Sequence, residues 1–245
     1  MKGGPVLILG ATSGMAREIA RSFAACGHPI QLAARNVSRL EDDKADLETR
    51  HGVAVTLHAF DALDLASHKG FVEGLPALPD IAICAVGAMG TQEENAADPE
   101  KGAIVMRANF EGPASILGHL ANAMEARGSG TLVGISSVAG DRGRASNYVY
   151  GSAKAGFTAF LSGLRNRLAN KGVHVLTVKP GFVATAMTEG MDLPEKLTAD
   201  PKEVGHAIRI AVQSQKNVIY IRPIWRLIMA IIKAIPEPIF KKTEI

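Results

Sequence analysis

The feature that most constrains the fold of this chain is a glycine-rich turn directly after a short apolar strand. The apolar run at residues 5–9 leads into a turn at 10–16, and a helical pattern continues to about residue 25. In a strand–turn–helix unit, such a turn lets the backbone approach a pyrophosphate, and the helix N-terminus attracts the anion. The sequence therefore predicts a dinucleotide site here. Its expected contacts are Gly10, Thr12, Ser13, Gly14 and Met15.

Short apolar runs alternate with helical patterns along the rest of the chain. Strands are expected at residues 5–9, 29–34, 53–60, 80–85, 131–135, 173–179 and 217–221, and further helices at 37–50, 98–127, 150–169 and from 200 onward. Continuously apolar strands that alternate with helices are typical of parallel sheets covered on both faces. The expected architecture is a Rossmann-type, doubly wound α/β fold of about seven strands in three α/β/α layers. The length suits one domain over residues 1–245.

A second stretch carries the chemistry. Ser137 follows the strand expected at 131–135, and Tyr150 and Lys154 open the next helix, one turn apart on one face. A free phenol has a pKa of about 10, and a nearby ammonium is expected to lower it toward the working range. Ser137 can then hydrogen-bond the same substrate oxygen. Taken alone, the Tyr-x-x-x-Lys spacing also occurs by chance as a packed Tyr and a surface Lys.

Together these motifs resemble the short-chain dehydrogenase/reductase family, whose pattern has an early Gly-x-x-x-Gly-x-Gly, an Asn in the fourth helix, Ser, Tyr-x-x-x-Lys and Pro-Gly. The matching positions, in the same order, are Gly10 and Gly14, Asn109, Ser137, Tyr150, Lys154 and Pro180-Gly181. The chain departs from the pattern at two places. Ala16 replaces the third Gly, and Cys84-Ala-Val-Gly87 replaces the family's Asn-Asn-Ala-Gly, so side-chain contacts of those two Asn residues are not carried over.

The resemblance assigns roles to residues that follow the third and fourth strands. In the family, an Asp placed like Asp61 contacts the adenine amino group, Ala62 lies beside it, and Gly87 gives room near the nicotinamide ribose. The backbone carbonyl of an Asn placed like Asn109 holds a water that extends a proton relay from the Lys. The alternatives are that Asp61 is a helix cap and Asn109 a buried, satisfied amide.

The resemblance also assigns the segment after the sixth strand. Pro180 and Gly181 interrupt that strand, and the family binds the nicotinamide carboxamide through the backbone of Val183 and the hydroxyl of Thr185. Residues 186–198 correspond to a mobile lid over the substrate. In reduction, Tyr150 donates the proton, and Lys154 also holds the nicotinamide ribose.

The end of the second strand indicates which cofactor is used. An acidic residue there would bind the 2′-hydroxyl of NAD, but the chain reads Ala34-Arg35-Asn36, with Arg39 a turn later. A guanidinium suits a 2′-phosphate, whereas a carboxylate would repel it. NADP(H) is therefore favoured over NAD(H), with Arg35 and Asn36 as contacts. The alternative is that Arg35 and Arg39 belong to a solvated helix start.

Composition excludes several other classes. A net charge of +3 is too small to indicate a nucleic-acid partner, and no metal site is expected. Cys26 and Cys84 are too few for a disulfide framework and are both expected to be buried thiols, which fits the cytoplasm. The N-terminus enters a strand at once, which leaves no room for a signal peptide, and no apolar run is long enough to span a bilayer.

The last 24 residues, 222–245, form an unusual apolar and basic tail. A very apolar helix at 224–235 carries Arg226 and Lys233 on one side. It either lies on a membrane surface through 224–242, with Trp225 and the cations at the headgroups, or is buried between subunits. The tail and the catalytic motif resemble the branch of the family that includes a reductase of decaprenylphosphoryl 2-keto-pentose, a lipid-linked sugar.

Three functions are compatible with the sequence. The first is an NADP(H)-dependent carbonyl reductase acting on a lipid-linked ketosugar or another amphipathic substrate, because the lid carries the apolar Met187 and Met191. These methionines equally suit packing onto the core. The second is a soluble reductase of small ketones or 3-oxoacyl groups, and the third is a cofactor-binding protein without turnover. Small residues on the helices near Asn109 and at 150–169 indicate a homodimer or homotetramer, as in the family.

Overall fold

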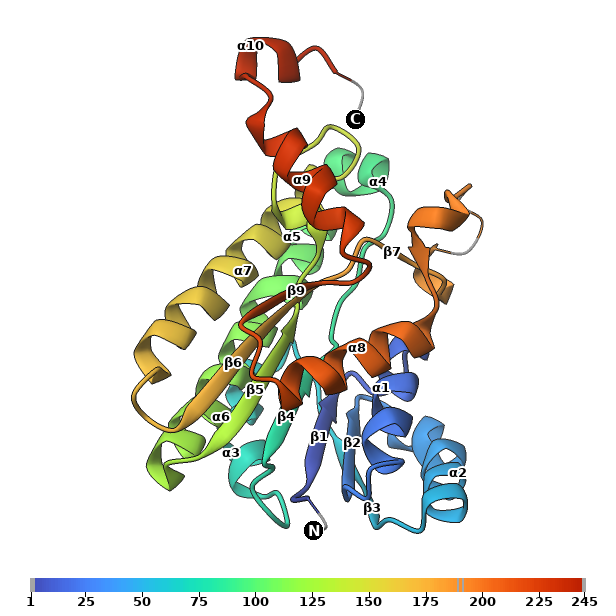
Figure 1. The fold of residues 1–245 in the computed structure, drawn as a ribbon, viewed down its shortest axis with the longest axis vertical. Coiled ribbons are helices and arrows are strands. Elements are labelled where there is room, and N and C mark those ends of the chain that lie inside the picture. Colours follow the sequence, from blue (N-terminus) through green and yellow to red (C-terminus); the bar gives the residue numbers. More distant parts are fainter. Residues whose placement is uncertain (1–2, 189, 191, 244–245) are drawn as a thin grey trace.

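The computed structural model describes residues 3–188, 190 and 192–243. Its centre is a parallel sheet of seven strands in the order β3-β2-β1-β4-β5-β6-β9 (Figure 1). The strands are β1 (Val6–Leu9), β2 (Ile30–Ala34), β3 (Val55–Ala59), β4 (Ile81–Cys84), β5 (Gly130–Ile135), β6 (Val173–Lys179) and β9 (Val218–Tyr220). The doubly wound α/β prediction is confirmed, and each expected strand is present within two residues of its predicted ends.

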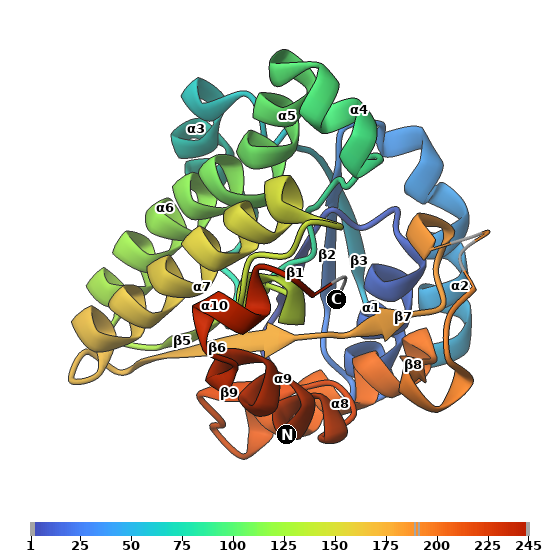
Figure 2. The same cartoon turned by 90° about the horizontal axis from the view of Figure 1, so that it is seen from above.

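Helices cover both faces of the sheet and complete three layers (Figure 2). One face carries α1 (Gly14–Ala24), α2 (Glu41–His51) and α8 (Pro201–Gln213), and the other carries α3 (His68–Glu73), α6 (Gly112–Arg127) and α7 (Tyr148–Leu168). A hydrophobic core lies on each face of the sheet, and successive side chains of a strand point into opposite cores. In β1, Val6 and Ile8 pack on the first face, and Leu7 and Leu9 pack on the second.

The strand order reverses beside β1, and this position sets where a ligand can bind. β1 pairs with β2 on one side and with β4 on the other, so the connections leave it in opposite directions. In such sheets the crevice lies outside the carboxyl ends of the strands at the reversal. The glycine-rich turn after Leu9 and the segment after Cys84 therefore face the same crevice.

The helix predicted at 98–127 is interrupted, and this differs from the sequence expectation. It consists of α5 (Pro99–Met106), a π-helical turn (Arg107–Glu111) and α6. The predicted ends are confirmed: the Asp98 side chain accepts hydrogen bonds at the start of α5, and Gly128, at φ 77°, ends α6. A short helix, α4 (Gln92–Ala97), was not predicted. The helix at 37–50 begins as a 3₁₀ turn (Val37–Leu40), and α7 begins two residues before Tyr150.

A small second sheet lies between β6 and α8. Its strands, β7 (Phe182–Val183) and β8 (Thr198–Ala199), bracket the segment expected to form the lid, which contains 3₁₀ turns at Ala186–Thr188 and Glu195–Leu197. A groove borders this segment. It is lined by Ala184, Thr185, Ala186, Thr188, Asp192, Leu193 and Thr198. The expectations for Met191 and for the Met187 side chain fall outside the described residues.

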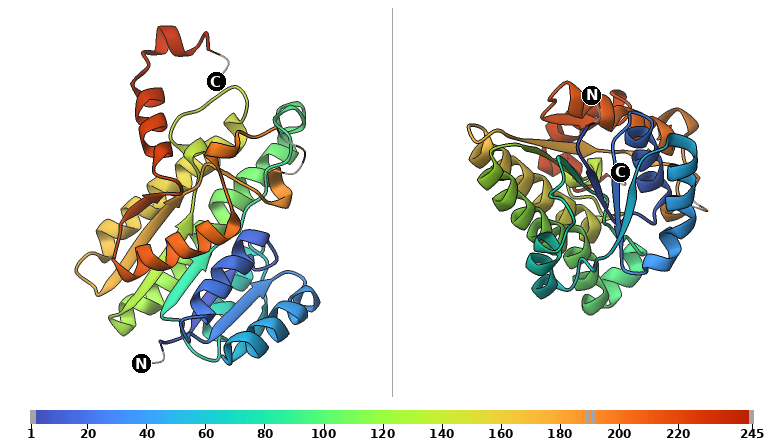
Figure 3. Two further views of the ribbon diagram at one scale, coloured as in Figure 1. Left: turned by 45° about the vertical axis from the view of Figure 1, so that its right-hand side comes forward. Right: turned by 90° about the horizontal axis from the view of Figure 1, so that it is seen from below.

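The tail forms α9 (Ile224–Ala234) and α10 (Glu237–Phe240), which project beyond the carboxyl ends of the strands (Figures 1 and 3). None of the described helices is long and apolar enough to cross a membrane. Trp225, which one of the two alternatives for the tail places at the headgroups, is buried because it packs against Phe182 with ring centroids 5.2 Å apart. The expectation that Cys26 is a buried thiol is wrong. Cys26 is exposed because it follows the last turn of α1, whereas Cys84 is buried in β4 as expected.

Candidate active site

The glycine-rich turn has the shape that a bound pyrophosphate requires. Gly10 has φ 80°, and a Cβ there would lie 3.0 Å from the backbone nitrogen of Val86, so the turn sits tightly on the end of β4. The Ser13 hydroxyl accepts a hydrogen bond of 3.1 Å from the Ala16 N–H and caps α1. Gly14, the first residue of α1, faces open space with no atom within 4 Å of an added Cβ. This free helix N-terminus fits a phosphate group.

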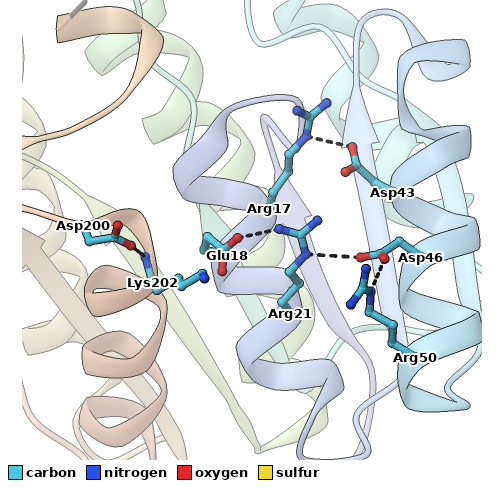
Figure 4. Close-up of polar contacts among 8 residues, drawn as sticks. All are labelled: Arg17, Glu18, Arg21, Asp43, Asp46, Arg50, Asp200 and Lys202. Carbon is cyan, nitrogen blue, oxygen red and sulfur yellow. Dashed lines mark hydrogen bonds and ion pairs between the residues drawn. The ribbon is translucent and has the colours of Figure 1, made fainter.

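The other predicted contacts in this turn, Thr12 and Met15, are partly buried at the start of α1. The next helix is tied to α1 by ion pairs (Figure 4). Arg17 pairs with Asp43 at 2.9 Å, and Arg21 pairs with Asp46 at 3.3 Å. These pairs hold α1 against α2, and they neutralise two carboxylates that would otherwise repel an anion on this side.

Arg35 and Asn36 lie at the carboxyl end of β2, where the second strand was expected to meet the adenosine ribose. Both are exposed. The Asn36 side chain accepts a hydrogen bond of 3.2 Å from the Ser38 N–H, so it caps the 3₁₀ turn that follows. Within the described part of the chain, the guanidinium of Arg35 makes no hydrogen bond or ion pair. Its donors are therefore available to a phosphate.

Asp61 and Ala62 follow β3. The Asp61 carboxylate accepts a hydrogen bond of 2.9 Å from the Leu63 N–H, so it closes a local turn and does not cap a helix. Ala62 is buried against the start of α6, where a Cβ on Gly112 would lie only 2.1 Å from the Ala62 carbonyl oxygen. Asp61 thus remains beside the crevice, while Ala62 anchors its segment to the helix layer.

Ser137, Tyr150 and Lys154 come together at the carboxyl end of β5. The Ser137 hydroxyl accepts a hydrogen bond of 3.1 Å from the Ala139 N–H, and Lys154 Nζ donates one of 3.0 Å to the Ile135 carbonyl. Lys154 is 3% exposed, and Nζ lies 5.7 Å from the centre of the Tyr150 ring. The predicted catalytic residues therefore share one small volume.

The electrostatics of this group differ from the sequence expectation. Burial raises the pKa of Tyr150 to about 12, while hydrogen bonding with Ser137 acts in the opposite direction. Burial also lowers the pKa of Lys154 to about 8, although the electrostatic effect of Cys84 acts to raise it. The expected lowering of the Tyr150 pKa by Lys154 is not found, because desolvation of the phenol dominates. At neutral pH, Tyr150 therefore holds its proton.

Asn109 lies in the π-helical turn and completes the group. It is fully buried, and its Nδ2 donates a hydrogen bond of 2.9 Å to the Val105 carbonyl and another to Ala88. A Cβ on Gly87 would lie 2.9 Å from Asn109 Oδ1 and 3.7 Å from Lys154 Nζ, which explains the need for glycine there. The structure thus brings Gly87, Asn109 and Lys154 together.

The sequence contains a reason for the irregular helix at Asn109. In an α-helix, the N–H of residue 113 would bond to the Asn109 carbonyl, but residue 113 is Pro and has no N–H. The backbone is instead wound as a π turn, a form that is frequent at functional sites. This arrangement is consistent with the predicted role of the Asn109 carbonyl in a proton relay.

The segment after β6 borders the catalytic group. The Val138 N–H donates a hydrogen bond of 2.9 Å to the Pro180 carbonyl, and Gly181 leaves space that the Trp225 ring fills, since a Cβ would lie 2.0 Å from it. Val183 is buried in β7. The Thr185 N–H donates a hydrogen bond of 3.2 Å to the Thr188 hydroxyl. These residues lie where the nicotinamide contacts were expected.

A polar cluster near the site, formed by Lys179, Asp141 and Tyr220, was not predicted from the sequence. Lys179, the last residue of β6, pairs with Asp141, and the Tyr220 hydroxyl donates a hydrogen bond of 2.7 Å to the other Asp141 oxygen. Burial raises the pKa of Tyr220 most, and the hydrogen bond to Asp141 raises it further. A lysine at the end of an apolar strand, directly before Pro-Gly, was the available signal, because a buried charge requires a partner.

The loop between Ser137 and Tyr150 also holds the tail. Arg142 donates hydrogen bonds of 2.6 Å to the carbonyls of Ile232 and Ile235 at the end of α9, and it pairs with Glu237 at 2.9 Å. Its guanidinium carbon lies 3.6 Å from the centre of the Phe240 ring. The C-terminal end of α9 is therefore anchored to the loop that connects Ser137 and Tyr150, two of the predicted catalytic residues.

Comparison with known proteins agrees with this geometry. A family model described as short chain dehydrogenase matches residues 5–196. An uncharacterized oxidoreductase of Mycobacterium tuberculosis is 39% identical over 241 residues, which cover 97% of this chain and 96% of that protein. An NADP-dependent 3-hydroxy acid dehydrogenase of Schizosaccharomyces pombe is 26% identical over 234 residues, with 89% and 90% coverage.

A solved structure shares the same fold. The short-chain dehydrogenase from Sphingobium yanoikuyae in complex with NADPH superposes with a TM-score of 0.80 at 25% identity, and the match covers 96% of this chain and 97% of that one. The family model and the mycobacterial relative each cover most of the chain. The catalytic group lies at the carboxyl edge of the doubly wound sheet, and the chain belongs to the short chain dehydrogenase family of oxidoreductases.

Proposed function

We propose that the protein is an NADP(H)-dependent carbonyl reductase that converts a ketone to an alcohol. The observation that carries this proposal is the half-buried phenol of Tyr150 next to Ser137, with the buried Lys154 one helical turn away and its Nζ 5.7 Å from the centre of the Tyr150 ring. The bound cofactor would supply a hydride to the carbonyl carbon. The residues of the chain must then stabilise the developing alkoxide and give it a proton.

Each residue has a distinct part in this step. Ser137 donates a hydrogen bond to the substrate oxygen and so orients the carbonyl next to Tyr150. Tyr150 gives its phenolic proton to the alkoxide, and its raised pKa of about 12 keeps the phenol protonated at neutral pH before this step. Lys154, with a pKa of about 8, carries a proton through the neutral range and stabilises the phenolate that remains.

Two features support NADP(H) as the cofactor. Arg35 has no acidic partner among the described residues, whereas Arg17 and Arg21 on the neighbouring helix are already paired. A structural neighbour of the same family carries NADPH. Arg35 and Asn36 would hold the 2′-phosphate, and the open N-terminus of α1 at Gly14 would hold the pyrophosphate.

For the substrate we propose an amphipathic ketone, with a lipid-linked ketosugar as the specific candidate. The support is the position of the tail, whose Trp225 packs on Gly181 and Phe182 beside the catalytic group. The second candidate is a soluble reductase of small ketones or 3-oxoacyl groups, which the similarity to a 3-hydroxy acid dehydrogenase favours. The catalytic residues serve both equally, so only turnover of a substrate panel distinguishes them.

The reaction class is tested by single-turnover oxidation of NADPH with a ketone that the wild-type protein reduces. Tyr150→Phe should lower the rate by at least about 100-fold, because a general acid contributes on the order of 10²–10⁴. Tyr148→Phe, an exposed tyrosine two residues away, is the matched control and should retain the wild-type rate. A Tyr150→Phe rate within a few-fold of wild type contradicts the assignment. NADPH binding without turnover of any ketone would favour a non-catalytic cofactor-binding protein.

We also propose a homodimer or homotetramer formed through the helices around α5 and α7. Ile104, Met106 and Phe110 are large apolar side chains exposed on this surface. Phe110 lies over Gly156 of α7, where an added Cβ would be 3.5 Å from its ring, so small residues leave this surface nearly flat. Light scattering at micromolar concentration tests the proposal, and a monomer contradicts it.

A further inference from the structure

The tail helix α9 carries apolar residues around more than half of its circumference, and the fold buries only part of them. Trp225, Met229 and Ile232 are buried and lie within about 60° of one another around the helix axis. They form a small core with Val138 and Phe182, next to the catalytic segment. This inner side explains why α9 is held on the protein. It does not explain the rest of the helix.

A second side of the helix exposes an apolar strip. Ile224, Leu227 and Ile231 of α9 are 45%, 58% and 59% exposed and also lie within about 60° of one another. Ile239 of α10 is 59% exposed. We call these four residues the outer strip. A helix on a protein surface normally presents polar residues outside its buried side, so an exposed apolar strip beside that side indicates contact with a partner.

The charges around the outer strip identify the kind of partner. Arg226 and Lys233 lie beside each other on the flank of the buried side that faces away from the outer strip, about 140° around the helix axis from the centre of that strip, and Lys241 and Lys242 follow α10; all four are exposed. The only acidic residue between 222 and 243 is Glu237, which is paired with Arg142. A second copy docked on this strip would bring cations against cations, which is unfavourable. An anionic lipid surface offers both an apolar layer and opposite charge.

We propose that α9 and α10 dock the protein on an anionic membrane surface, with the outer strip entering the lipid interface and the four cations at the headgroups. α9 and α10 lie at the end of the molecule where the strands end and the catalytic group is found (Figure 1). Arg142 ties α9 to the loop between Ser137 and Tyr150. A docked bilayer would therefore lie close to the loop between Ser137 and Tyr150. The inference concerns binding alone and does not depend on the proposed reaction.

The experiment is co-sedimentation of the full chain with vesicles of phosphatidylcholine, either alone or with about one third phosphatidylglycerol. The wild-type protein should bind the anionic vesicles and bind neutral ones at least about tenfold more weakly. Leu227→Gln combined with Ile231→Gln should weaken binding to the anionic vesicles by at least about tenfold. Arg226→Gln combined with Lys233→Gln should do the same, since each cation strengthens binding roughly fivefold.

Ile210→Gln is the matched control, because Ile210 is 45% exposed on α8, away from the tail. It should bind vesicles as wild type does, and circular dichroism should show that every variant is folded. Absence of wild-type binding to anionic vesicles overturns the proposal, as does equal binding by wild type and the Leu227/Ile231 variant. If that variant instead changes only the sedimentation velocity, from oligomer to monomer, the outer strip is a subunit interface and the proposal is wrong.

Discussion

The half of this protein proposed to bind the nucleotide and the half proposed to carry catalysis place their charged groups very differently; we call them the nucleotide half and the catalytic half. In the first half, ion pairs such as Arg17–Asp43 lie at the rim between α1 and α2, and the Arg17 side chain is 40% exposed (Figure 4). In the second half, Lys179 and Asp141 form a pair with side chains only 10% and 3% exposed, and Lys154 is buried as well.

This difference has an energetic meaning. Exposed ion pairs contribute about 0–1 kcal/mol, because water screens them and the side chains lose freedom. Buried charges depend on their partners, and removal of one partner costs about 3–5 kcal/mol. The nucleotide half is therefore a scaffold with replaceable surface charges. The catalytic half contains buried charges, which lower the stability of the fold unless they are paired. The same buried groups hold the site in a fixed arrangement.

The largest effect is expected for the buried pair. Asp141→Asn should lower the free energy of unfolding by about 3–5 kcal/mol, because Lys179 is left as a buried charge without its carboxylate. Asp43→Asn, in the rim pair, is the matched control and should change stability by at most about 1 kcal/mol. Urea denaturation of both variants measures the difference. If both variants lose a similar free energy of unfolding, the proposed difference between the two halves is wrong.

A smaller effect, of opposite sign, is expected at Lys154. Its pKa of about 8 in the folded chain lies below the ordinary 10.5, so the folded state disfavours its charged form. Lys154→Met should therefore stabilise the protein at pH 7 by about 2 kcal/mol while reduction of the ketone is lost. The unfolded chain binds more protons than the folded one between pH 8 and 10.5, so the wild type gains stability as pH rises there.

The advantage of the Lys154→Met variant should therefore shrink across that pH range. Thermal unfolding of wild type and variant at several pH values tests this directly. A Met variant that is less stable than wild type at pH 7 would show that Lys154 is not a destabilising charge in the folded protein.

The smallest effect concerns Arg35, a cation of the nucleotide half that has no ion-pair partner among the residues that the structure describes. Arg35→Ala should weaken NADPH binding by about tenfold, since a charge-assisted hydrogen bond contributes about 1.5 kcal/mol or more. NADH binding and the free energy of unfolding should stay nearly unchanged. Arg50→Ala, which removes a surface pair on α2, is the control. Fluorescence titration measures both cofactors, and equal losses would show that Arg35 does not contact the phosphate.

Much of the fold follows from patterns that are local in the sequence. The seven strands were predictable because each is a short run rich in apolar residues that is separated from its neighbours by turns and helical patterns. Asp98-Pro99 and Gly128 marked helix ends because their backbone chemistry acts within a few residues. The π turn was not predicted as an element, although Pro113 supplies its local reason. The short α4 carries no strong apolar period, so it could not be predicted from the pattern of its residues.

Trp225 and Tyr150 differ from the sequence expectation because their surroundings come from distant parts of the chain. Trp225 looked suited to a membrane surface, but Gly181, 44 positions earlier, leaves the space in which its ring is buried. The pKa of Tyr150 was expected to fall because Lys154 is near in sequence. It is raised because burial depends on the packing of several elements around the phenol.

By itself the sequence determined the doubly wound fold, the family, and the positions of Ser137, Tyr150 and Lys154, because strand patterns, turns and helical spacing are written in neighbouring residues. Only the tertiary structure decided how these groups are charged and what holds them. The Asp141–Lys179 pair and the attachment of α9 by Arg142 join residues 38 and about 90 positions apart. Such contacts depend on how the elements pack, and burial, which packing creates, sets both their strength and the protonation of the site.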